Sequence, residues 1–200
     1  MLIVITTPNF FDGESDLINL LFHNGLRRLH LRKPDAPLED YEGLLRRIEP
    51  QFRHNVVLHD HFHLAFKYNV LGIHLNRRNS EIPDNFSGSV SRSLHTEEEL
   101  AVMKNKYNYV TLSPIFDSIS KQGYNSAFEH EKLLEMKKNG IIDSRVIALG
   151  GITAHNISQL KQYGFGGAMV LGSLWEKKDD EKEFLAEFKS LSLNAPDSIR

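Results

Sequence analysis

Short apolar runs recur along the chain, and the segments between them carry apolar residues three or four positions apart. The short runs are typical of buried strands, and the wider spacing is typical of helices with one buried face. Alternation of strand and helix favours parallel pairing of the strands. The pattern predicts eight strands, at residues 2–6, 28–32, 55–60, 72–76, 89–93, 109–113, 145–150 and 167–172.

The intervening segments predict helices, the last of them at about 180–191, followed by a frayed tail at about 192–200. We expect Asp40, Thr96 and Thr153 to start helices, because their side chains can cap the first turn. The segment ITAHNISQLKQYG, which follows the seventh apolar run, is expected to be one of these helices, whereas HFHLAFKYN has room only for a brief one.

Eight strands with interleaved helices close most economically into a barrel. The alternative is an open doubly wound sheet, but the first apolar run is followed by TTPNFFDG, which lacks the glycine pattern of a dinucleotide-binding turn. The fold class is therefore predicted as α/β, a single small (β/α)8 TIM barrel that spans residues 1–200 as one domain. In such a barrel the active site lies at the carboxyl ends of the strands.

The composition of the chain excludes or disfavours several classes of function. The formal net charge of −2 gives no electrostatic reason to expect nucleic acid as a partner. The chain has no cysteine, which excludes disulfides, thiolate metal sites and a cysteine nucleophile, and which fits a reducing compartment. The amino-terminal MLIVITTPNF has the pattern of a first strand and not of a signal peptide, and no apolar run reaches the roughly 18 residues of a membrane span. We expect a cytoplasmic protein with no membrane partner.

Glycines follow the last two predicted strands. Gly150 and Gly151 end the seventh run, and Gly172 and Ser173 follow the eighth. Glycine allows a backbone to approach a bulky ligand closely, and a helix that opens just beyond supplies free N–H groups. The loops after strands seven and eight are also where barrels often bind phosphate. A tight turn alone would explain either glycine pair, but their common position favours a phosphate site.

Charged and polar side chains end the other strands. His30, Arg32 and Lys33 follow the second run, His59 and Asp60 the third, and an arginine pair the fourth. The connection at 113–128 is long and rich in hydroxyls. This pattern indicates an anion-binding pole with one hard oxygen ligand for a cation.

Two other kinds of site are weakly indicated. His59, His61 and His63 alternate, but no H-E-x-x-H is present, and alternate residues of a helical turn would not share a face. A Ser-His-Asp triad can be assembled from Ser93, His95 and Asp60, but no nucleophile-elbow sequence accompanies it.

The motifs resemble, in order, those of the family of thiamine phosphate synthase and thiazole tautomerase, from residue 1 to about 176. HLRK is similar to Q-L-R-x-K, LHDHFHLA to I-N-D-x-x-x-L-A, and GIHLNRRN to G-V-H-L-G-Q-x-D. SRSLHT, SPIFDSISK and ALGGIT match further family segments.

The resemblance implies a small barrel that joins a hydroxymethylpyrimidine diphosphate to a thiazole phosphate with the help of Mg²⁺. It implies small phosphorylated substrates as the partners, and a homodimer as a state common for such folds. The implied roles are Mg²⁺ binding by Asp60 and Asn79, catalysis by Arg32, Ser93 and Lys121, and substrate binding by His30, Lys33, His59, Ser118, Ser120, Gly150, Gly151, Gly172 and Ser173.

The chain departs from the synthase pattern at four positions. His30 replaces a glutamine, Pro34 a lysine, His59 an asparagine and Asn79 an aspartate. Asn79 still offers an oxygen but brings no charge, which should weaken Mg²⁺ binding. The tautomerase branch often has histidine in the second-strand position, yet its proton-transferring histidine falls at Ser113. Synthase chemistry is the first expectation; a tautomerase-like isomerase and a non-catalytic barrel that binds thiazole or thiamine phosphate are the alternatives.

Overall fold

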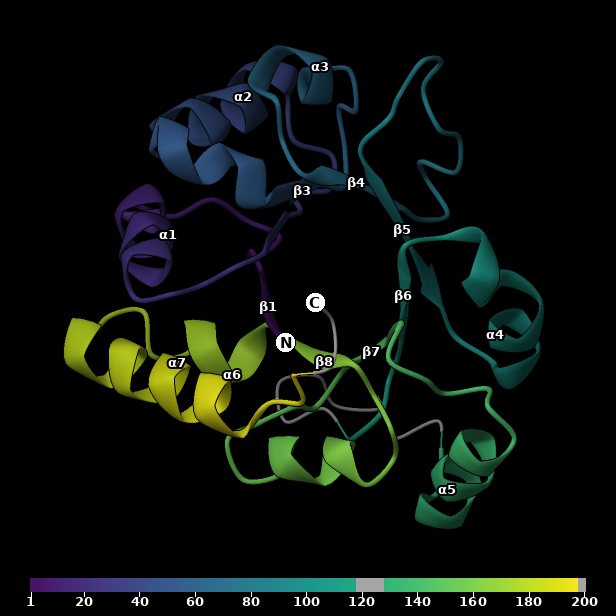
Figure 1. Ribbon diagram of the computed structural model, residues 1–200. Helices are drawn as coiled ribbons and strands as arrows, with labels where there is room; N and C mark the ends of the chain where they lie inside the picture. The colour runs from purple at the N-terminus through teal and green to yellow at the C-terminus, as the bar shows by residue number, and fades with distance from the viewer. Residues whose placement is uncertain (118–127, 198–200) are drawn as a thin grey trace. The chain divides into compact units, whose positions relative to one another are not determined.

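The structure of the protein is a computed structural model that describes residues 1–117 and 128–197. Its strands form a closed barrel in which they follow one another in chain order (Figure 1). The pairs β1–β2, β2–β3, β3–β4, β6–β7 and β7–β8 are parallel. All eight predicted strands are thereby confirmed: β1 (Leu2–Ile5), β2 (Leu29–Leu31), β3 (Val56–Leu58), β4 (Gly72–Leu75), β5 (Ser89–Leu94), β6 (Tyr109–Leu112), β7 (Val146–Leu149) and β8 (Gly167–Val170).

Helical segments lie between the strands and after the last one. They are α1 (Glu14–His23), α2 (Leu38–Arg47), η1 (Pro50–Asn55), α3 (Leu64–Tyr68), α4 (Glu97–Met103), η2 (Lys104–Lys106), α5 (His130–Lys138), η3 (Ile157–Lys161), α6 (Gly172–Trp175) and α7 (Glu181–Asn194), where η marks a 3₁₀ helix. None of the helices in the described residues is long and apolar enough to cross a membrane.

Residue contacts divide the chain into two compact units. The N-terminal unit is Val4–Ser91, and the C-terminal unit is Met1–Ile3 together with Arg92–Arg200. The expectation that residues 1–200 form a single domain stays a prediction.

In the N-terminal unit, strand register explains which side chains share a face. His30 lies opposite Val57 in the β2–β3 pair, and Leu58 lies opposite Ile73 in the β3–β4 pair. Because side chains alternate along a strand, the side chain of His59 lies on the same face as that of Val57. The register places His74, one residue after Ile73, next to His59 on that face. The strand leucines that flank these positions point to the opposite face. The register therefore brings three histidines from consecutive strands onto one face.

In the C-terminal unit, β6, β7 and β8 are buried along most of their length, as the apolar runs predict. The pair β6–β7 places Val110 opposite Val146. Helix α6 lies beside α7 (Figure 1), and the rings of Trp175 and Phe184 are 5.4 Å apart between them. The last helix thus covers the segment that follows β8.

Three local expectations are wrong and one is confirmed. Thr153 does not start a helix, because η3 begins at Ile157 after Asn156. The segment after β7 contains only the 3₁₀ helix η3, because the side chain of Asn156 bonds the N–H of Thr153 and the carbonyl of Gly151 and so holds a turn. Asp40 lies inside α2, which starts after Pro37. Thr96 does cap α4, accepting from the N–H of Glu99.

The carboxyl-terminal helix is longer than predicted. Helix α7 continues to Asn194, and the two residues after it, Ala195 and Pro196, are buried. The tail predicted at about 192–200 is therefore helical or packed as far as residue 196, because apolar contacts continue past residue 191.

Candidate functional site

Asp60 is the centre of a polar cluster in the N-terminal unit, directly after β3. Its Oδ1 atom accepts hydrogen bonds from Nη2 of Arg78 at 3.2 Å and from Nδ2 of Asn79 at 2.9 Å. Its Oδ2 atom is buried and has no hydrogen-bond partner among the described residues. A buried carboxylate oxygen without a donor is costly, and a bound cation would remove that cost. The cluster therefore fits the Mg²⁺ that the family resemblance implies.

Asn79 holds Asp60 in place. Its amide nitrogen donates to Asp60 and also, at 3.0 Å, to the main-chain carbonyl of His59. In this orientation the nitrogen faces the carboxylate, and the amide would have to turn over to offer its oxygen to a cation. Asp60 is thus the stronger of the two metal-ligand candidates, and ligation by Asn79 stays a prediction.

Arg32 contributes positive charge to the same cluster. It is half-buried, and this partial burial lowers the pKa of its guanidinium, as does nearby Arg78, while Asp60 raises it. An arginine keeps its charge in proteins, so the result is two guanidiniums around one carboxylate. Such a cluster carries an excess of positive charge for a diphosphate.

The structure places Lys33 away from this cluster, in a buried ion pair. Its Nζ atom lies 2.6 and 2.7 Å from the two carboxylate oxygens of Glu14 and 2.8 Å from the carbonyl oxygen of Asn9. Both side chains are buried, and burial lowers the pKa of Lys33 and raises that of Glu14, against the attraction between them. Because an ammonium has three N–H donors, these three acceptors leave none for a substrate.

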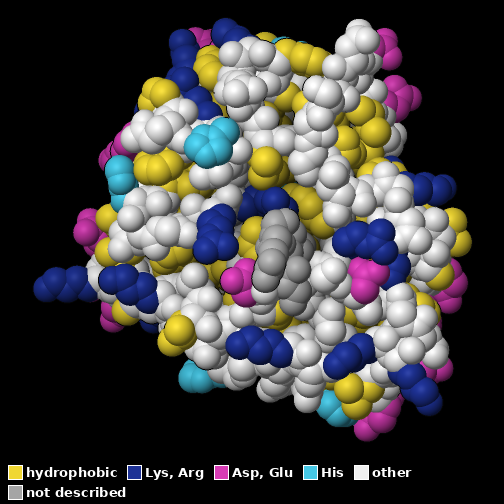
Figure 2. Space-filling view, in the orientation of Figure 1, with side chains coloured by type: hydrophobic (Ala, Val, Ile, Leu, Met, Phe, Trp, Pro, Cys, Tyr) yellow, Lys and Arg dark blue, Asp and Glu magenta, His cyan; other side chains and the backbone are white. Residues whose placement is uncertain are grey.

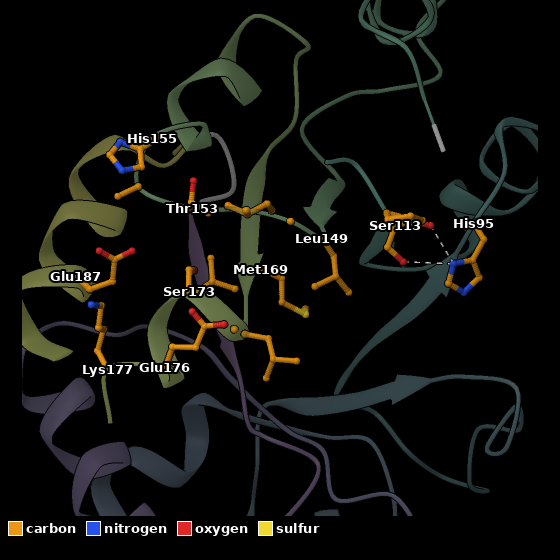
Figure 3. A pocket seen from close by; sticks show the side chains of 18 residues that line it. His95, Ser113, Leu149, Thr153, His155, Met169, Ser173, Glu176, Lys177 and Glu187 are labelled. Atoms are coloured by element: carbon orange, nitrogen blue, oxygen red, sulfur yellow. Dashed lines mark hydrogen bonds between the residues drawn. The ribbon is translucent and has the colours of Figure 1, made fainter. Parts of the chain in front are cut away.

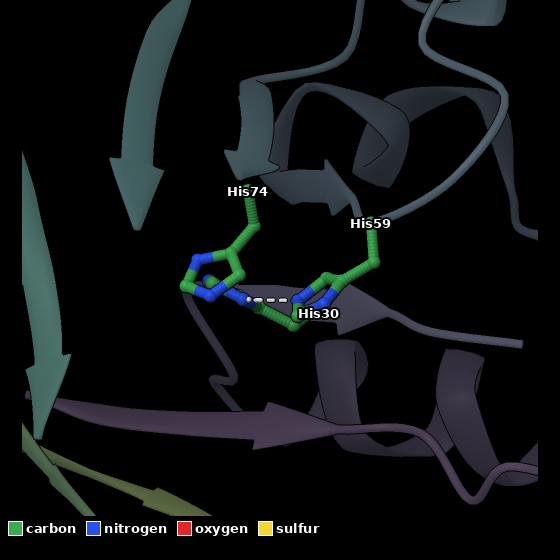
Figure 4. A group of neighbouring side chains, drawn as sticks. All are labelled: His30, His59 and His74. Carbon is green, nitrogen blue, oxygen red and sulfur yellow. Dashed lines mark hydrogen bonds between the residues drawn. The ribbon is translucent and has the colours of Figure 1, made fainter. Parts of the chain in front are cut away.

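His30, His59 and His74 form a second feature of this unit (Figure 4), called here the histidine trio. Nδ1 of His30 lies 2.8 Å from Nε2 of His59, and the rings of His59 and His74 stack with centroids 4.3 Å apart. Burial, reinforced by the neighbouring imidazoles, lowers the pKa of His30 and His59 well below the usual 6.5. These two rings are therefore neutral at neutral pH.

The trio cannot be found by comparing histidines that are close in the sequence. Of the alternating set, His61 bonds the carbonyl of Ala36 and His63 is exposed, so only His59 belongs to the trio. The available signal was position: each member of the trio lies in or directly after one of three consecutive strands.

The C-terminal unit contains a cavity of about 450 Å³, called here the glycine pocket. Gly150, Gly151, Gly172 and Ser173, all predicted from the sequence, line it together. Ser173 is labelled among the lining side chains in Figure 3. The hydroxyl oxygen of Ser173 is buried and has no hydrogen-bond partner among the described residues. The pocket thus brings together the glycines and one unsatisfied hydroxyl.

The structure shows why glycine is needed at positions 150 and 151, which the sequence alone does not show. Gly150 and Gly151 have φ angles of 98° and 65°, a region that favours glycine. A Cβ atom on Gly151 would lie 2.4 Å from the carbonyl oxygen of Asp117 and 2.5 Å from that of Phe116. Close approach of the 116–117 backbone therefore requires glycine at position 151. The helix expected to open just beyond the glycines is absent, because η3 starts only at Ile157.

Glu176, Lys177 and Glu187 were not predicted to be part of the site, and His95 was considered only as part of a Ser-His-Asp triad. His95 lies against Ser113, with Nδ1 3.3 Å from the hydroxyl oxygen (Figure 3). Lys177 lines the pocket together with Glu176 and Glu187, so one ammonium offsets part of the acidic charge.

The remaining predicted residues lie elsewhere. Ser93 accepts a hydrogen bond from Thr111 at 3.4 Å and does not line the glycine pocket. Ser118, Ser120 and Lys121 lie outside the described residues. On the face shown in Figure 2, basic side chains are interspersed with acidic and apolar ones and no single charge covers it, in keeping with the net charge of −2.

Comparison with known proteins extends these observations. A family model described as Thiamine monophosphate synthase matches residues 2–174. The crystal structure of a thiamine phosphate pyrophosphorylase from Bacteroides thetaiotaomicron is 43% identical, with a TM-score of 0.87, and the match covers 96% of this chain and 95% of that one.

Two more distant matches are a curated sequence and a solved structure. The thiamine-phosphate synthase of Photorhabdus laumondii is 25% identical over 171 residues, which are 81% of this chain and 79% of the relative. A thiamine phosphate pyrophosphorylase from Pyrococcus furiosus is 17% identical with a TM-score of 0.75, over 96% of this chain and 93% of that one, and shares the fold.

Proposed function

We propose that this chain, which belongs to the thiamine monophosphate synthase family, joins a hydroxymethylpyrimidine diphosphate to a thiazole phosphate and releases thiamine phosphate and diphosphate. The single observation that carries the proposal is the buried Oδ2 of Asp60, which has no hydrogen-bond partner among the described residues and lies in a cluster with Arg78. A carboxylate and guanidiniums together are what binding a diphosphate through a divalent cation requires.

The reaction needs no nucleophile from the protein. The bond between the pyrimidine methylene carbon and the diphosphate oxygen breaks, and its electron pair leaves with the diphosphate. The lone pair of the thiazole nitrogen then forms the new carbon–nitrogen bond, which makes the ring a cation. Catalysis therefore consists of placing the two substrates and stabilising the negative charge of the leaving group.

The N-terminal unit would bind the diphosphate. When bound, Mg²⁺ would supply positive charge to the leaving group. Asp60 would hold the ion, Asn79 would orient the Asp60 carboxylate, and Arg32 would donate hydrogen bonds to phosphate oxygens. The ion pair between Lys33 and Glu14 would stabilise the segment before β2 and leave Lys33 out of substrate binding.

The glycine pocket would bind the thiazole phosphate. The Ser173 hydroxyl, buried and without a partner in the described residues, would donate to a phosphate oxygen, as would N–H groups of the loops that contain Gly151 and Gly172. Glu176 and Glu187 would lower affinity for a dianion at the same wall, with Lys177 offsetting them in part.

One observation favours a second candidate function. The tautomerase pattern places a proton-transferring histidine where this chain has Ser113, and His95 brings an imidazole against that serine inside the pocket. An isomerase that moves a proton on a thiazole carboxylate phosphate could use His95 as its acid or base.

The test is to incubate the purified protein with both synthase substrates and Mg²⁺ and to follow thiamine phosphate and diphosphate. The synthase proposal predicts that the two products form in equal amounts. Faster interconversion of thiazole carboxylate phosphate isomers without coupling would support the second candidate. Binding of thiazole phosphate with neither reaction would indicate a regulatory barrel.

A cytoplasmic location and a homodimer complete the proposal. Cell fractionation and light scattering test them, and a membrane-bound fraction or a monomer in solution would contradict them.

A further inference from the structure

Three buried imidazoles from three neighbouring strands of the N-terminal unit meet in one cluster. His30 and His74 are 0% and 1% exposed, and His59 is 3% exposed. One ring nitrogen from each residue lies within 4.8 Å of the others. Buried polar side chains usually satisfy one another or bind a ligand, and two of these three rings share one hydrogen bond.

The hydrogen bonds of Ser91 determine the tautomer of His74. The Ser91 hydroxyl donates to the carbonyl of Ile73 at 3.3 Å, so its single proton is used there. Nδ1 of His74 lies 2.8 Å from the same hydroxyl oxygen and must therefore be the donor to it. Nε2 of His74 then carries a lone pair. An imidazole whose other nitrogen donates to a second residue is the usual state of a metal-binding histidine.

Two of the four departures from the family pattern, His30 and His59, are members of the trio. His74 matches the histidine of G-V-H-L-G-Q-x-D, whereas His30 and His59 stand where the synthase pattern has glutamine and asparagine. Two amides beside a histidine make a polar pocket, but they do not make a transition-metal site. Two further imidazoles supply the ligands that zinc, cobalt, nickel and copper ions prefer.

We propose that His30, His59 and His74 bind one transition-metal dication of the zinc type, with three imidazole nitrogens as ligands and a fourth position open for a further ligand. Three protein ligands with one open position is a known arrangement for such ions. Nitrogen-to-metal distances of about 2.0–2.1 Å would require small movements of the rings from a 2.8 Å hydrogen bond.

The surrounding charge indicates the nature of the fourth ligand. Arg28 acts on His30, and Arg32 and Arg78 act on His59, each disfavouring added positive charge. A dication with three neutral ligands would therefore be balanced best by an anion, such as hydroxide or a phosphate oxygen. The trio differs in ligand chemistry from Asp60, whose oxygen suits Mg²⁺.

The experiment uses the full chain, freed of any histidine tag and stripped with a chelator. Titration with Co²⁺ is expected to give one bound ion per chain, with the visible absorption of a four-coordinate site. Zn²⁺ should displace Co²⁺, and a large excess of Mg²⁺ should not. The bound ion should also raise the unfolding temperature.

Two variants that restore the family residues, His30→Gln and His59→Asn, provide the specific test. Each is expected to weaken Co²⁺ binding by about 100-fold or more, since it removes a ligand and losses of this size follow even from changes outside the ligands. The matched control is His63→Gln, an exposed histidine outside the trio, which should bind Co²⁺ within about twofold of the unchanged chain.

The proposal does not depend on the proposed function, because binding and unfolding are read without substrates. Absence of stoichiometric Co²⁺ binding to the unchanged chain would overturn it. So would equal affinity in His30→Gln and His63→Gln, or displacement of Co²⁺ by Mg²⁺, which would locate the ion at oxygen ligands.

Discussion

The amide nitrogen of Asn79 lies 2.9 Å from Oδ1 of Asp60, at a position where the synthase pattern has an aspartate. The contact replaces a second carboxylate with a hydrogen-bond donor. It keeps Asp60 in one orientation and leaves its Oδ2 atom as the one carboxylate oxygen in the cluster without a partner among the described residues. One charge is thereby removed from a site that would bind a dication.

The Asn79→Asp variant tests this relationship. A second carboxylate should strengthen Mg²⁺ binding, because hard cations favour carboxylate oxygens over amides. The Mg²⁺ concentration for half-maximal turnover is expected to fall about tenfold, which corresponds to about 1.4 kcal/mol. Asn85→Asp, an exposed change on the same connection, is the control. An unchanged Mg²⁺ requirement in Asn79→Asp would show that this position does not act on the metal.

Ser173→Ala tests the glycine pocket. Loss of a hydrogen bond to a charged group costs about 1.5–3 kcal/mol, so thiazole phosphate should bind roughly 10- to 100-fold more weakly. Calorimetric titration measures the affinity, with Ser192→Ala, an exposed change in α7, as the control. Equal affinities in the two variants would show that Ser173 does not bind the phosphate. Gly151 is less suitable, since any side chain there would meet the 116–117 backbone.

Lys33→Met separates stability from substrate binding. It would leave the Glu14 carboxylate buried without its partner, and removal of one member of a buried pair costs about 3–5 kcal/mol. Denaturant unfolding should show this loss, and the folded fraction should keep its KM for the diphosphate substrate. Lys67→Met, which breaks an exposed pair with Glu42, should change stability little. A raised KM with unchanged stability would show that Lys33 binds the substrate.

The histidine trio predicts how the metal-free protein responds to acid. Burial lowers the pKa of His30 and His59 below 6.5, so near that pH the unfolded chain takes up protons that the folded chain does not. Stability is then complete above about pH 6.5 and falls as the pH decreases below it, by up to about 1.4 kcal/mol per pH unit for each ring.

Denaturant unfolding between pH 7 and pH 5 measures this slope. The double variant His30→Gln/His59→Asn should flatten it, and His63→Gln should not. The same slope in all three proteins would mean that other groups cause it.

The strands could be predicted from the sequence because their evidence is local. The run Val146–Leu149, for example, is apolar throughout, and burial on both faces of a strand demands that pattern. The segment after β7 was misjudged because its apolar spacing fits a helix, while the turn held by Asn156 depends on contacts with Gly151 that spacing does not show.

The candidate site was predicted only in part, for a similar reason. Asp60 and the glycines follow strands directly, so their position could be read from the chain. Lys33 follows a strand in the same way, but it pairs with Glu14, which lies 19 residues earlier, and local sequence does not show that pairing. The trio is assembled by strand register, which links residues too distant for a motif.

The most direct test of the proposed function is the Mg²⁺ dependence of thiamine phosphate formation in Asp60→Ala compared with Asp84→Ala, an exposed aspartate of the same unit. We expect the unchanged protein to form thiamine phosphate and diphosphate in equal amounts. Asp60→Ala should lose about 10²–10³-fold in turnover, partly recovered at excess Mg²⁺, and Asp84→Ala should lose none. Full activity of Asp60→Ala at ordinary Mg²⁺, or no coupling by the unchanged protein, would contradict the proposed function.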